Sequence, residues 1–317
     1  MPVHNDALMD NLCHTLVGAA LGEACLKRRT RYGHATLMIA SNLPDIDVLV
    51  FATAAPSVAF RRGWTHGVLA QALLPIVLTG VMLAVARRLP ARDADPPIRA
   101  RDLLLLSYIG VITHVLMDLL NTYGVRLLMP FDGRWFYGDA TFIIDPWLWL
   151  VLGAGVWLAR RRRSPMAAQR ALMVALAYVL AMVVSARAAR DVIIERWKEV
   201  DGRPPQALMV GPVPVTPLTR AVIIDAGNHY ETGTFTWQPR SVRFDEAVVE
   251  KNDSDPRVAV ARNAPNIRAF LVWSRFPFFT LEPVPEGTRV TVGDMRFAGQ
   301  GPAVRTFTQS TIVRRAN

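Results

Sequence analysis

Residues 66–86, HGVLAQALLPIVLTGVMLAVA, decide the fold class of this chain. After His66 the stretch contains no ionisable side chain. Because a helix rises 1.5 Å per residue, about 20 residues extend about 30 Å, the thickness of the hydrocarbon core of a bilayer. The stretch therefore predicts a transmembrane helix, and the hydrophobic share of the whole chain, 51%, agrees with a membrane protein.

Further apolar stretches lie on both sides of this one and crowd into residues 1–190. We expect an α-helical polytopic membrane bundle of five or six segments there. The first segment is rich in glycine and alanine, which suits close packing between helices. In chain order the expected segments are residues 11–26, 35–40 with the adjoining residues 42–47, 66–86, 103–120, 146–159 and 171–186.

The charges between these segments predict an orientation. The first, third and fifth connecting loops carry 4, 5 and 5 cations, whereas the second and fourth carry 2 each. Cytoplasmic loops of membrane proteins hold the excess of lysine and arginine. We therefore expect the odd loops in the cytoplasm of a bacterium, and the even loops and everything after residue 186 outside its inner membrane. Since the arginines cluster between apolar segments, the net charge of +10 does not indicate a nucleic-acid partner.

The amino-acid composition changes near residue 204, where five prolines occur within 14 residues. Proline interrupts helices. Stretches rich in β-branched and aromatic residues then alternate with polar ones, separated by turn sequences such as Asp225-Ala226-Gly227-Asn228. Residues 204–317 are expected to form a small all-β soluble domain. The expected strands are residues 221–224, 232–237, 257–261, 270–273, 289–292 and 304–312.

Six ionisable side chains lie inside the expected membrane segments, where such groups are costly and often functional. With the predicted orientation, all six fall toward the outer ends of four segments. Two of them, His114 and Asp118, are four residues apart and share one helix face. Imidazole and carboxylate ligands suit zinc, manganese or iron. The six residues are His14, Asp45, Asp47, His66, His114 and Asp118.

Each of these residues can also be explained without a metal ion. His14 can be a packed histidine bonded to a backbone carbonyl, and the two aspartates near Pro44 can cap a helix. His66 can be an interfacial residue, and His114 with Asp118 can form a neutral intramembrane pair. One metal site explains all four segments together, so we favour it.

Four short motifs occur in an order and spacing that resemble a known family. They cover roughly residues 9–160 and read Asp10-Asn11-Leu12-Cys13-His14-Thr15, Asn42-Leu43-Pro44-Asp45-Ile46-Asp47, Arg62-Gly63-Trp64-Thr65-His66-Gly67 and His114-Val115-Leu116-Met117-Asp118. The chain resembles the bacterial membrane-bound metal-dependent hydrolases, which are distantly similar to zinc-dependent phospholipase C. The resemblance implies that the metal ligands are His14, Asp45, His66, His114 and Asp118, with Asp47 as a ligand, an orienting residue or a base.

The leading hypothesis is a membrane-embedded hydrolase that uses one or two divalent ions, with zinc expected, to cleave a phosphoester in a lipid or lipid-linked substrate. Asp45 or Asp47 would bridge two ions or act as general base. We expect substrate or ligand-orienting contacts from Asn42, Thr65, Asn121, Arg126 and Arg134.

Two other function classes remain open. The first is a non-catalytic membrane protein with a structural metal or a proton-linked transport site. Transport would favour polar groups spread through the depth of the membrane, whereas here they gather at one level. The second is a peptidase, against which the missing zincin motif His-Glu-x-x-His counts for that class alone.

Overall fold

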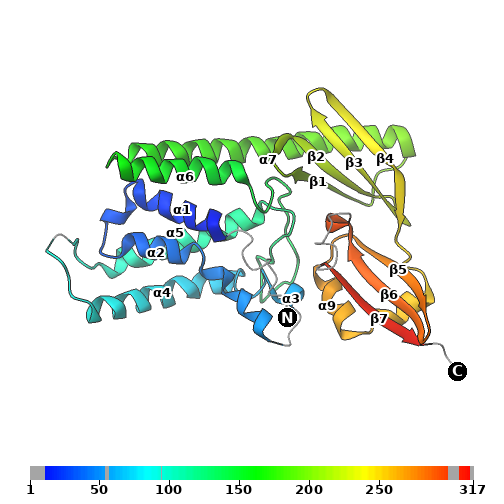
Figure 1. The fold of residues 1–317 in the computed structure, drawn as a ribbon, viewed down its shortest axis with the longest axis horizontal. Helices are drawn as coiled ribbons and strands as arrows, with labels where there is room; N and C mark the ends of the chain where they lie inside the picture. Colours follow the sequence, from blue (N-terminus) through cyan, green and yellow to red (C-terminus); the bar gives the residue numbers. More distant parts are fainter. Residues whose placement is uncertain (1–10, 54–56, 94, 299–306, 315–317) are drawn as a thin grey trace. The chain divides into compact units, whose positions relative to one another are not determined.

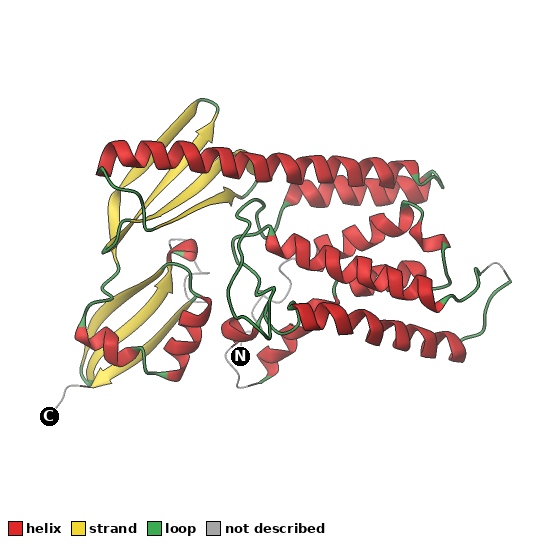
Figure 2. Ribbon diagram, turned by 180° about the vertical axis from the view of Figure 1, so that it is seen from behind, coloured by secondary structure: helices red, strands yellow, loops and turns green. Residues whose placement is uncertain are grey.

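The computed structural model describes residues 11–53, 57–93, 95–298 and 307–314. They form two compact units, Met1–Ala52 with Arg61–Ser185, and Thr53–Phe60 with Ala186–Asn317. The first unit is helical, and the second contains both sheets (Figures 1 and 2). The division falls inside the longest helix, α7, which runs Met166–Asp201.

The described residues of the first unit form five further α-helices and two 3₁₀ helices (Figure 1). Helix α2 packs against α1 on one side and α5 on the other, and α4 packs against α5. In chain order these elements are α1 (Asn11–Glu23), η2 (Leu26–Arg28), α2 (Gly33–Ala40), η3 (Leu43–Ala52), α4 (Val68–Arg88), α5 (Ala100–Leu119) and α6 (Pro146–Arg161).

Three helices of the described chain, α4, α5 and α7, are long and apolar enough to cross a membrane. The pair α2 and η3 meets the same criterion together, although it bends by 50° at the break between them. The count of five or six spans is therefore not confirmed. Helices α1 and α6 have only 13 and 16 residues, fewer than the roughly 20 that a perpendicular span needs.

One face of α4 carries large apolar side chains that no other part of the described chain covers. Leu73, Ile76 and Val77 are 51%, 53% and 60% exposed, whereas Leu78 and Met82 are buried on the face toward α5. Large apolar side chains that are exposed side by side need an apolar environment. The arrangement agrees with a helix that faces lipid on one side and protein on the other.

Small residues allow α2 to approach both of its neighbours. A Cβ atom on Gly18 of α1 would lie 2.9 Å from the carbonyl oxygen of Leu37, and one on Gly110 of α5 would lie 2.4 Å from Cβ of Ala40. Close backbone approach at small residues is the usual way in which membrane helices associate. The two contacts place the C-terminal end of α2 between α1 and α5, where Ser41 follows.

We expect Gly110→Ala to destabilise the helical unit by about 1–3 kcal/mol, because its methyl group overpacks the α2–α5 contact. Gly80→Ala on α4 is the matched control, since a Cβ there meets no atom within 4 Å. Thermal unfolding of the detergent-purified chain measures both variants. Equal melting temperatures for the two would contradict the importance of this contact.

The second unit contains two antiparallel sheets, ordered β1-β2-β3-β4 and β5-β6-β7. The C-terminal part of α7 covers the first sheet, where Ile193 and Trp197 pack with Val222 and Phe235. The strands are β1 (Ala207–Val213), β2 (Thr216–Asp225), β3 (His229–Trp237), β4 (Arg240–Glu250), β5 (Pro277–Val284), β6 (Gly287–Asp294) and β7 (Thr308–Arg314). The short helix α3 (Ser57–Phe60) also belongs to this unit.

The expectation of an all-β domain is wrong in one region. The predicted strands 257–261 and 270–273 are parts of helices α8 (Pro256–Ala261) and α9 (Pro265–Trp273). Each helix has proline in its first turn, where that residue favours helix, and the side chain of Asp255 caps α8. The buried residues of α9, Ile267, Phe270 and Trp273, recur every three positions, which is a helical spacing.

The other predicted strands fall within the sheets. Residues 221–224, 232–237 and 289–292 lie in β2, β3 and β6. Of the predicted strand 304–312, residues 308–312 lie in β7, and residues 304–306 lie outside the described residues. Strands β1, β4 and β5 were not predicted. Strand β4 alternates partly buried and exposed positions only around Val242 and Phe244 and is exposed along most of its remaining length, so its pattern is weak.

A buried ion pair holds the second sheet to the segment before it. Asp294, at the end of β6, accepts hydrogen bonds from Nε of Arg296 at 2.8 Å, Oγ of Ser274 at 2.7 Å and the backbone N–H of Arg275 at 2.7 Å. Burial by itself raises the pKa of Asp294, but the Arg296 guanidinium and these hydrogen bonds lower it further than burial raises it. The net pKa is therefore below the ordinary value.

Because the folded pKa of Asp294 is depressed, its stabilising contribution is present above the unfolded pKa of about 3.9 and is lost as the pH falls below that value. We expect Asp294→Asn to remove this contribution at neutral pH and to destabilise the unit by about 3–5 kcal/mol, since it leaves Arg296 buried without its partner. Hydrogen exchange of β5 and β6 in the full chain measures the effect. Unchanged protection in the variant at pH 7 would refute this role.

Candidate metal centre

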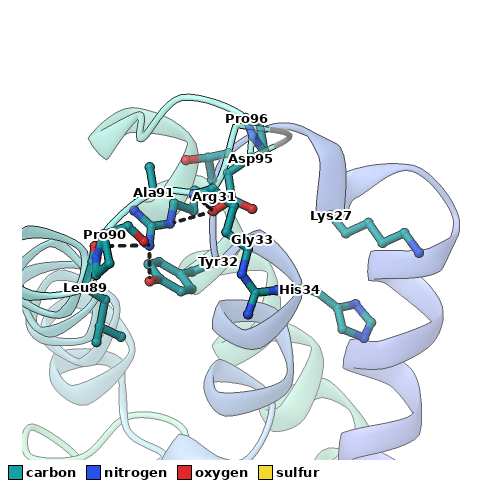
Figure 3. A pocket seen from close by; sticks show the side chains of 12 residues that line it. Lys27, Arg31, Tyr32, Gly33, His34, Leu89, Pro90, Ala91, Asp95 and Pro96 are labelled. Atoms are coloured by element: carbon teal, nitrogen blue, oxygen red, sulfur yellow. Dashed lines mark hydrogen bonds and ion pairs between the residues drawn. The ribbon is translucent and has the colours of Figure 1, made fainter.

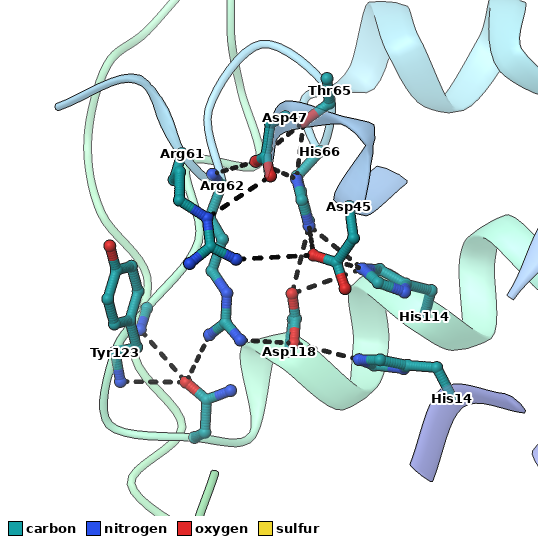
Figure 4. Close-up of polar contacts among 12 residues, drawn as sticks. His14, Asp45, Asp47, Arg61, Arg62, Thr65, His66, His114, Asp118 and Tyr123 are labelled. Atoms are coloured by element: carbon teal, nitrogen blue, oxygen red, sulfur yellow. Dashed lines mark hydrogen bonds and ion pairs between the residues drawn. The ribbon is translucent and has the colours of Figure 1, made fainter. Parts of the chain in front are cut away.

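The six ionisable residues predicted from the sequence lie together at one end of the first unit (Figure 4). All are buried except Asp45, which is half-buried. Four structural elements contribute them. The residues are His14 from α1, Asp45 and Asp47 from η3, His66 from the turn before α4, and His114 and Asp118 from the last turns of α5.

Four of these residues form a compact ligand group. Asp45, His66, His114 and Asp118 each offer one nitrogen or oxygen atom, and these atoms all lie within 4.8 Å of one another. Nε2 of His66 lies 3.1 Å from Nε2 of His114 and 3.1 Å from Oδ2 of Asp118. Nε2 of His114 lies 3.5 Å from Oδ2 of Asp118 and 3.7 Å from Oδ1 of Asp45.

Most of these separations are close to those around a tetrahedral metal ion, and the separation of Nε2 of His66 from Oδ1 of Asp45 is wider, at 3.8 Å. Ligand bonds to zinc of about 2.0–2.1 Å at a tetrahedral angle place neighbouring ligand atoms about 3.3 Å apart. The four distances given above, 3.1–3.7 Å, lie around that value. Two imidazoles and two carboxylates also form a donor set that zinc, manganese and iron accept.

The hydrogen bonds on the far sides of the two imidazoles decide which nitrogen faces the group. The Nδ1–H of His114 donates to the backbone carbonyl of Ser41 at 2.8 Å, since that oxygen only accepts. Oγ1 of Thr65 donates to Asp47 at 3.2 Å, so it accepts from Nδ1 of His66 at 2.9 Å. In the neutral rings both Nε2 atoms then carry lone pairs, directed at each other across 3.1 Å. Such lone pairs repel unless a cation or a proton lies between them.

Asp47 therefore has a different position from the other predicted ligands. Its Oδ2 lies 3.6 Å from Nδ1 of His66, on the side of the ring away from the ligand group, and accepts the backbone N–H of Arg62 at 2.7 Å. A carboxylate behind a ligating histidine fixes the ring orientation and raises its basicity. Asp47 therefore lies where an orienting residue would lie, and of the two aspartates in the Asn-Leu-Pro-Asp-Ile-Asp motif only Asp45 belongs to the four-residue group.

The two carboxylate oxygens of Asp118 face different partners. Its Oδ1 lies 2.9 Å from Nη2 of Arg62, while its Oδ2 faces His66 and His114. The same guanidinium donates from Nη1 to Oδ1 of Asn121 at 2.9 Å. Arg62 thus neutralises one carboxylate oxygen and leaves the other for the ligand group.

His14 lies beside the four-residue group and not within it. Its ring stacks on the ring of His114 with centroids 3.9 Å apart, and its Nε2 lies 3.5 Å from Oδ1 of Asp118. His14 thus contacts the Asp118 oxygen that pairs with Arg62, and not the oxygen that faces His66 and His114.

The residues predicted to bind substrate do not all reach this site. Asn42 donates to Oγ1 of Thr15 and lines a groove of about 490 Å³ together with Asp45. Asn121 and Thr65 are engaged in the contacts that orient Arg62 and His66. Arg134 is exposed and bonds Asp132 at 2.6 Å.

Arg126, the fifth predicted substrate residue, is buried in the loop after α5. Its backbone N–H donates to the carbonyl of Arg62 at 2.9 Å, and its guanidinium lies 5.2 Å from the ring centroid of Trp135. A Cβ on Gly63 would lie 2.5 Å from Nη2 of Arg126, so the guanidinium lies directly against the backbone of the loop before α4. These contacts support the loop that carries Arg62.

Three contributors to the site were not predicted: Arg61, Arg62 and the carbonyl of Ser41. The two arginines directly precede the Gly-Trp-Thr-His motif, so their proximity to His66 in sequence was the available signal. Both were interpreted as the cations of an external loop, and Arg62 also as part of a family motif, but neither was assigned to the site. The Ser41 carbonyl has no sequence signal, because every residue has one.

A larger pocket, of about 670 Å³, lies at the arginine-rich end of the first unit, away from the ligand group (Figure 3). Arg31 lines it and donates to the backbone carbonyls of Leu89 and Pro90 and to the hydroxyl of Tyr32. These hydrogen bonds tie the segment before α2 to the segment after α4. No residue of the ligand group lines this pocket.

The apolar helices and the buried histidine–aspartate group define a membrane protein with a candidate metal centre. The chain belongs to the YdjM inner membrane protein family, whose sequence model matches residues 9–189, more than half of the chain. The inner-membrane part of the predicted resemblance is therefore confirmed. The hydrolase activity that the resemblance implies stays a prediction.

One curated relative matches more weakly. Over 162 residues the chain is 24% identical to "Uncharacterized protein YfhP" of Bacillus subtilis (strain 168), and the match covers 48% of this chain and 47% of that protein. The chain thus spans about half the length of the curated relative. No solved structure matches the chain.

We expect Arg62→Met to destabilise the helical unit by about 3–5 kcal/mol, because it leaves the buried carboxylate of Asp118 without its cation. Arg134→Met, which removes an exposed arginine, is the control and should change stability by less than about 0.5 kcal/mol. Thermal unfolding in detergent compares the two. A similar small shift in both would mean that Arg62 does not compensate Asp118.

Proposed function

We propose that this chain is a metal-dependent hydrolase of the bacterial inner membrane that cleaves a phosphoester in a lipid or lipid-linked substrate. The observation that carries the proposal is the pair of Nε2 atoms of His66 and His114, 3.1 Å apart, with Asp45 and Asp118 completing a four-ligand group. Both rings are held by hydrogen bonds at Nδ1, so both present the atom that binds metals.

A bound zinc ion would supply Lewis acidity and would lower the pKa of a coordinated water to about 7. The residues of the chain provide the rest. Asp118 and the two histidines are fully enclosed, whereas the side chain of Asp45 is 12% exposed and also lines the neighbouring groove. Asp45 is therefore the group that can accept a proton from a water molecule entering from the groove.

The groove supports a lipid-like substrate. Its walls include Met38, Ile39, Leu43 and Ile46, and its polar side includes Asn42 and Asp45. An amphiphile with an apolar chain and a polar ester would match both sides. The proposed orientation, with the ligand group and residues after 186 on the outer side, follows from the excess of arginine in the odd loops.

The same observation supports a second candidate, a non-catalytic protein. A shared proton between His66 and His114 would also relieve the repulsion of their lone pairs, as in a proton-linked site. In addition, four protein ligands around one ion is the usual pattern of structural zinc, whereas catalytic sites keep one position open. The exposure of Asp45 to the groove is what favours the catalytic alternative.

Metal analysis of the detergent-purified chain tests the proposal. We expect about one or two zinc ions per chain, and His114→Ala, His66→Ala and Asp45→Ala should each retain about a tenth of that content or less, because a ligand is lost. His229→Ala is the matched control, since this histidine lies on β3 of the other unit. A metal-free wild type, or unchanged zinc in His114→Ala, would end the proposal.

Chelation separates the two candidates. For a hydrolase, removing zinc should abolish phosphodiesterase activity and cost little stability. For a structural site, the same treatment should unfold the helical unit, because metal binding energy is then folding energy. Circular dichroism and a phosphodiester assay on one chelated sample distinguish these outcomes.

A further inference from the structure

Arg61 carries a buried guanidinium with few partners. The side chain is nine-tenths buried, and its Nε makes no hydrogen bond with the described residues. Its nearest acidic atoms are Oδ1 of Asp47 at 3.5 Å and Oδ1 of Asp45 at 4.0 Å, both beyond the usual hydrogen-bonding range of about 2.7–3.2 Å. An arginine has five N–H donors, and buried donors are normally satisfied.

Arg61 compensates the charge of the buried Asp47 carboxylate, but this pairing leaves its Nε without a hydrogen bond among the described residues. Asp47 already accepts the backbone N–H of Arg62 at 2.7 Å and the hydroxyl of Thr65 at 3.2 Å. Asp118 is neutralised by Arg62 and not by Arg61. The aromatic contact of Arg61, 5.5 Å from the ring centroid of Phe51, engages a face of the guanidinium and uses none of its N–H groups.

The guanidinium is directed at the ligand group. Figure 4 shows it beside Asp47 with one nitrogen pointing toward Asp45, and Asp45 is the ligand that also borders the groove. An anion that entered from the groove and approached the ligand group would meet Arg61 on one side. The planar fork of arginine matches two oxygens of a phosphate or a carboxylate.

We propose that Arg61 is the oxyanion-binding residue of this site and takes two oxygens of a phosphoryl group. This inference rests on the proposed function and names the side chain that would select a phosphoester. It assigns to Arg61 the role that sequence reasoning gave to Arg126 and Arg134. Arg134 is exposed and paired with Asp132, and Arg126 supports the loop that carries Arg62.

Binding of inorganic phosphate to the zinc-loaded, detergent-purified chain tests the inference, with calorimetry for affinity and elemental analysis for zinc. We expect Arg61→Gln to weaken phosphate binding about tenfold or more while zinc content stays at the wild-type level, since charge-assisted hydrogen bonds to the anion are lost. Arg61→Lys keeps the charge without the fork and should weaken binding less. Arg87→Gln, at the exposed end of α4, is the matched control and should bind as the wild type does.

The outcomes separate this inference from the proposed function. Equal phosphate affinity in the wild type and Arg61→Gln, or loss of binding in Arg134→Gln alone, would overturn the role of Arg61 and leave the metal centre standing. Loss of zinc in Arg61→Gln would make it a residue that positions Asp45 and would also overturn the role.

Two further results remain decisive. If the wild type binds no zinc, the proposed function fails, and phosphate binding is then measured on the metal-free protein. Binding that is lost in Arg61→Gln supports the role of Arg61. Absence of binding to the wild type overturns that role. If Arg61→Gln does not fold, Arg61→Lys decides, and wild-type affinity in that variant overturns the role of the arginine fork.

Discussion

The burial of the Asp118 carboxylate is the constraint on which the first unit depends. A charge in an apolar region is costly unless other groups compensate it. Arg62 compensates one oxygen, and His66 and His114 contact the other. These partners come from the turn before α4 and from α5, so the contacts that make a candidate metal centre also join the elements around it.

Helix packing and site chemistry are linked through Ser41. Gly18 and Gly110 allow the backbone of α2 to lie close to α1 and α5, and Ser41 is the residue that follows α2. Its carbonyl then accepts the Nδ1–H of His114, which turns Nε2 toward the ligand group. Small residues about one helical turn from His14 and His114 therefore help to set the tautomer of His114.

Sequence reasoning succeeded where one physical property acts over a long stretch. Twenty apolar residues predict a helix that crosses lipid, whatever their neighbours, and residues 68–88 form such a helix. It failed where a short stretch depends on its surroundings. Residues 257–261 and 270–273 have β-branched and aromatic side chains typical of strands, but two prolines and the cap at Asp255 start helices there.

For the candidate site, the sequence by itself determined which ionisable side chains lie in apolar segments, because such groups are rare and stand out from their neighbours. It also determined the family, through residues 9–189. Only the tertiary structure decided their arrangement: Asp45 in the ligand group, Asp47 behind His66, His14 beside Asp118, and Arg61 near both aspartates. The reason is that these contacts join elements far apart in the chain, and their distances of 3–4 Å depend on how closely the helices pack.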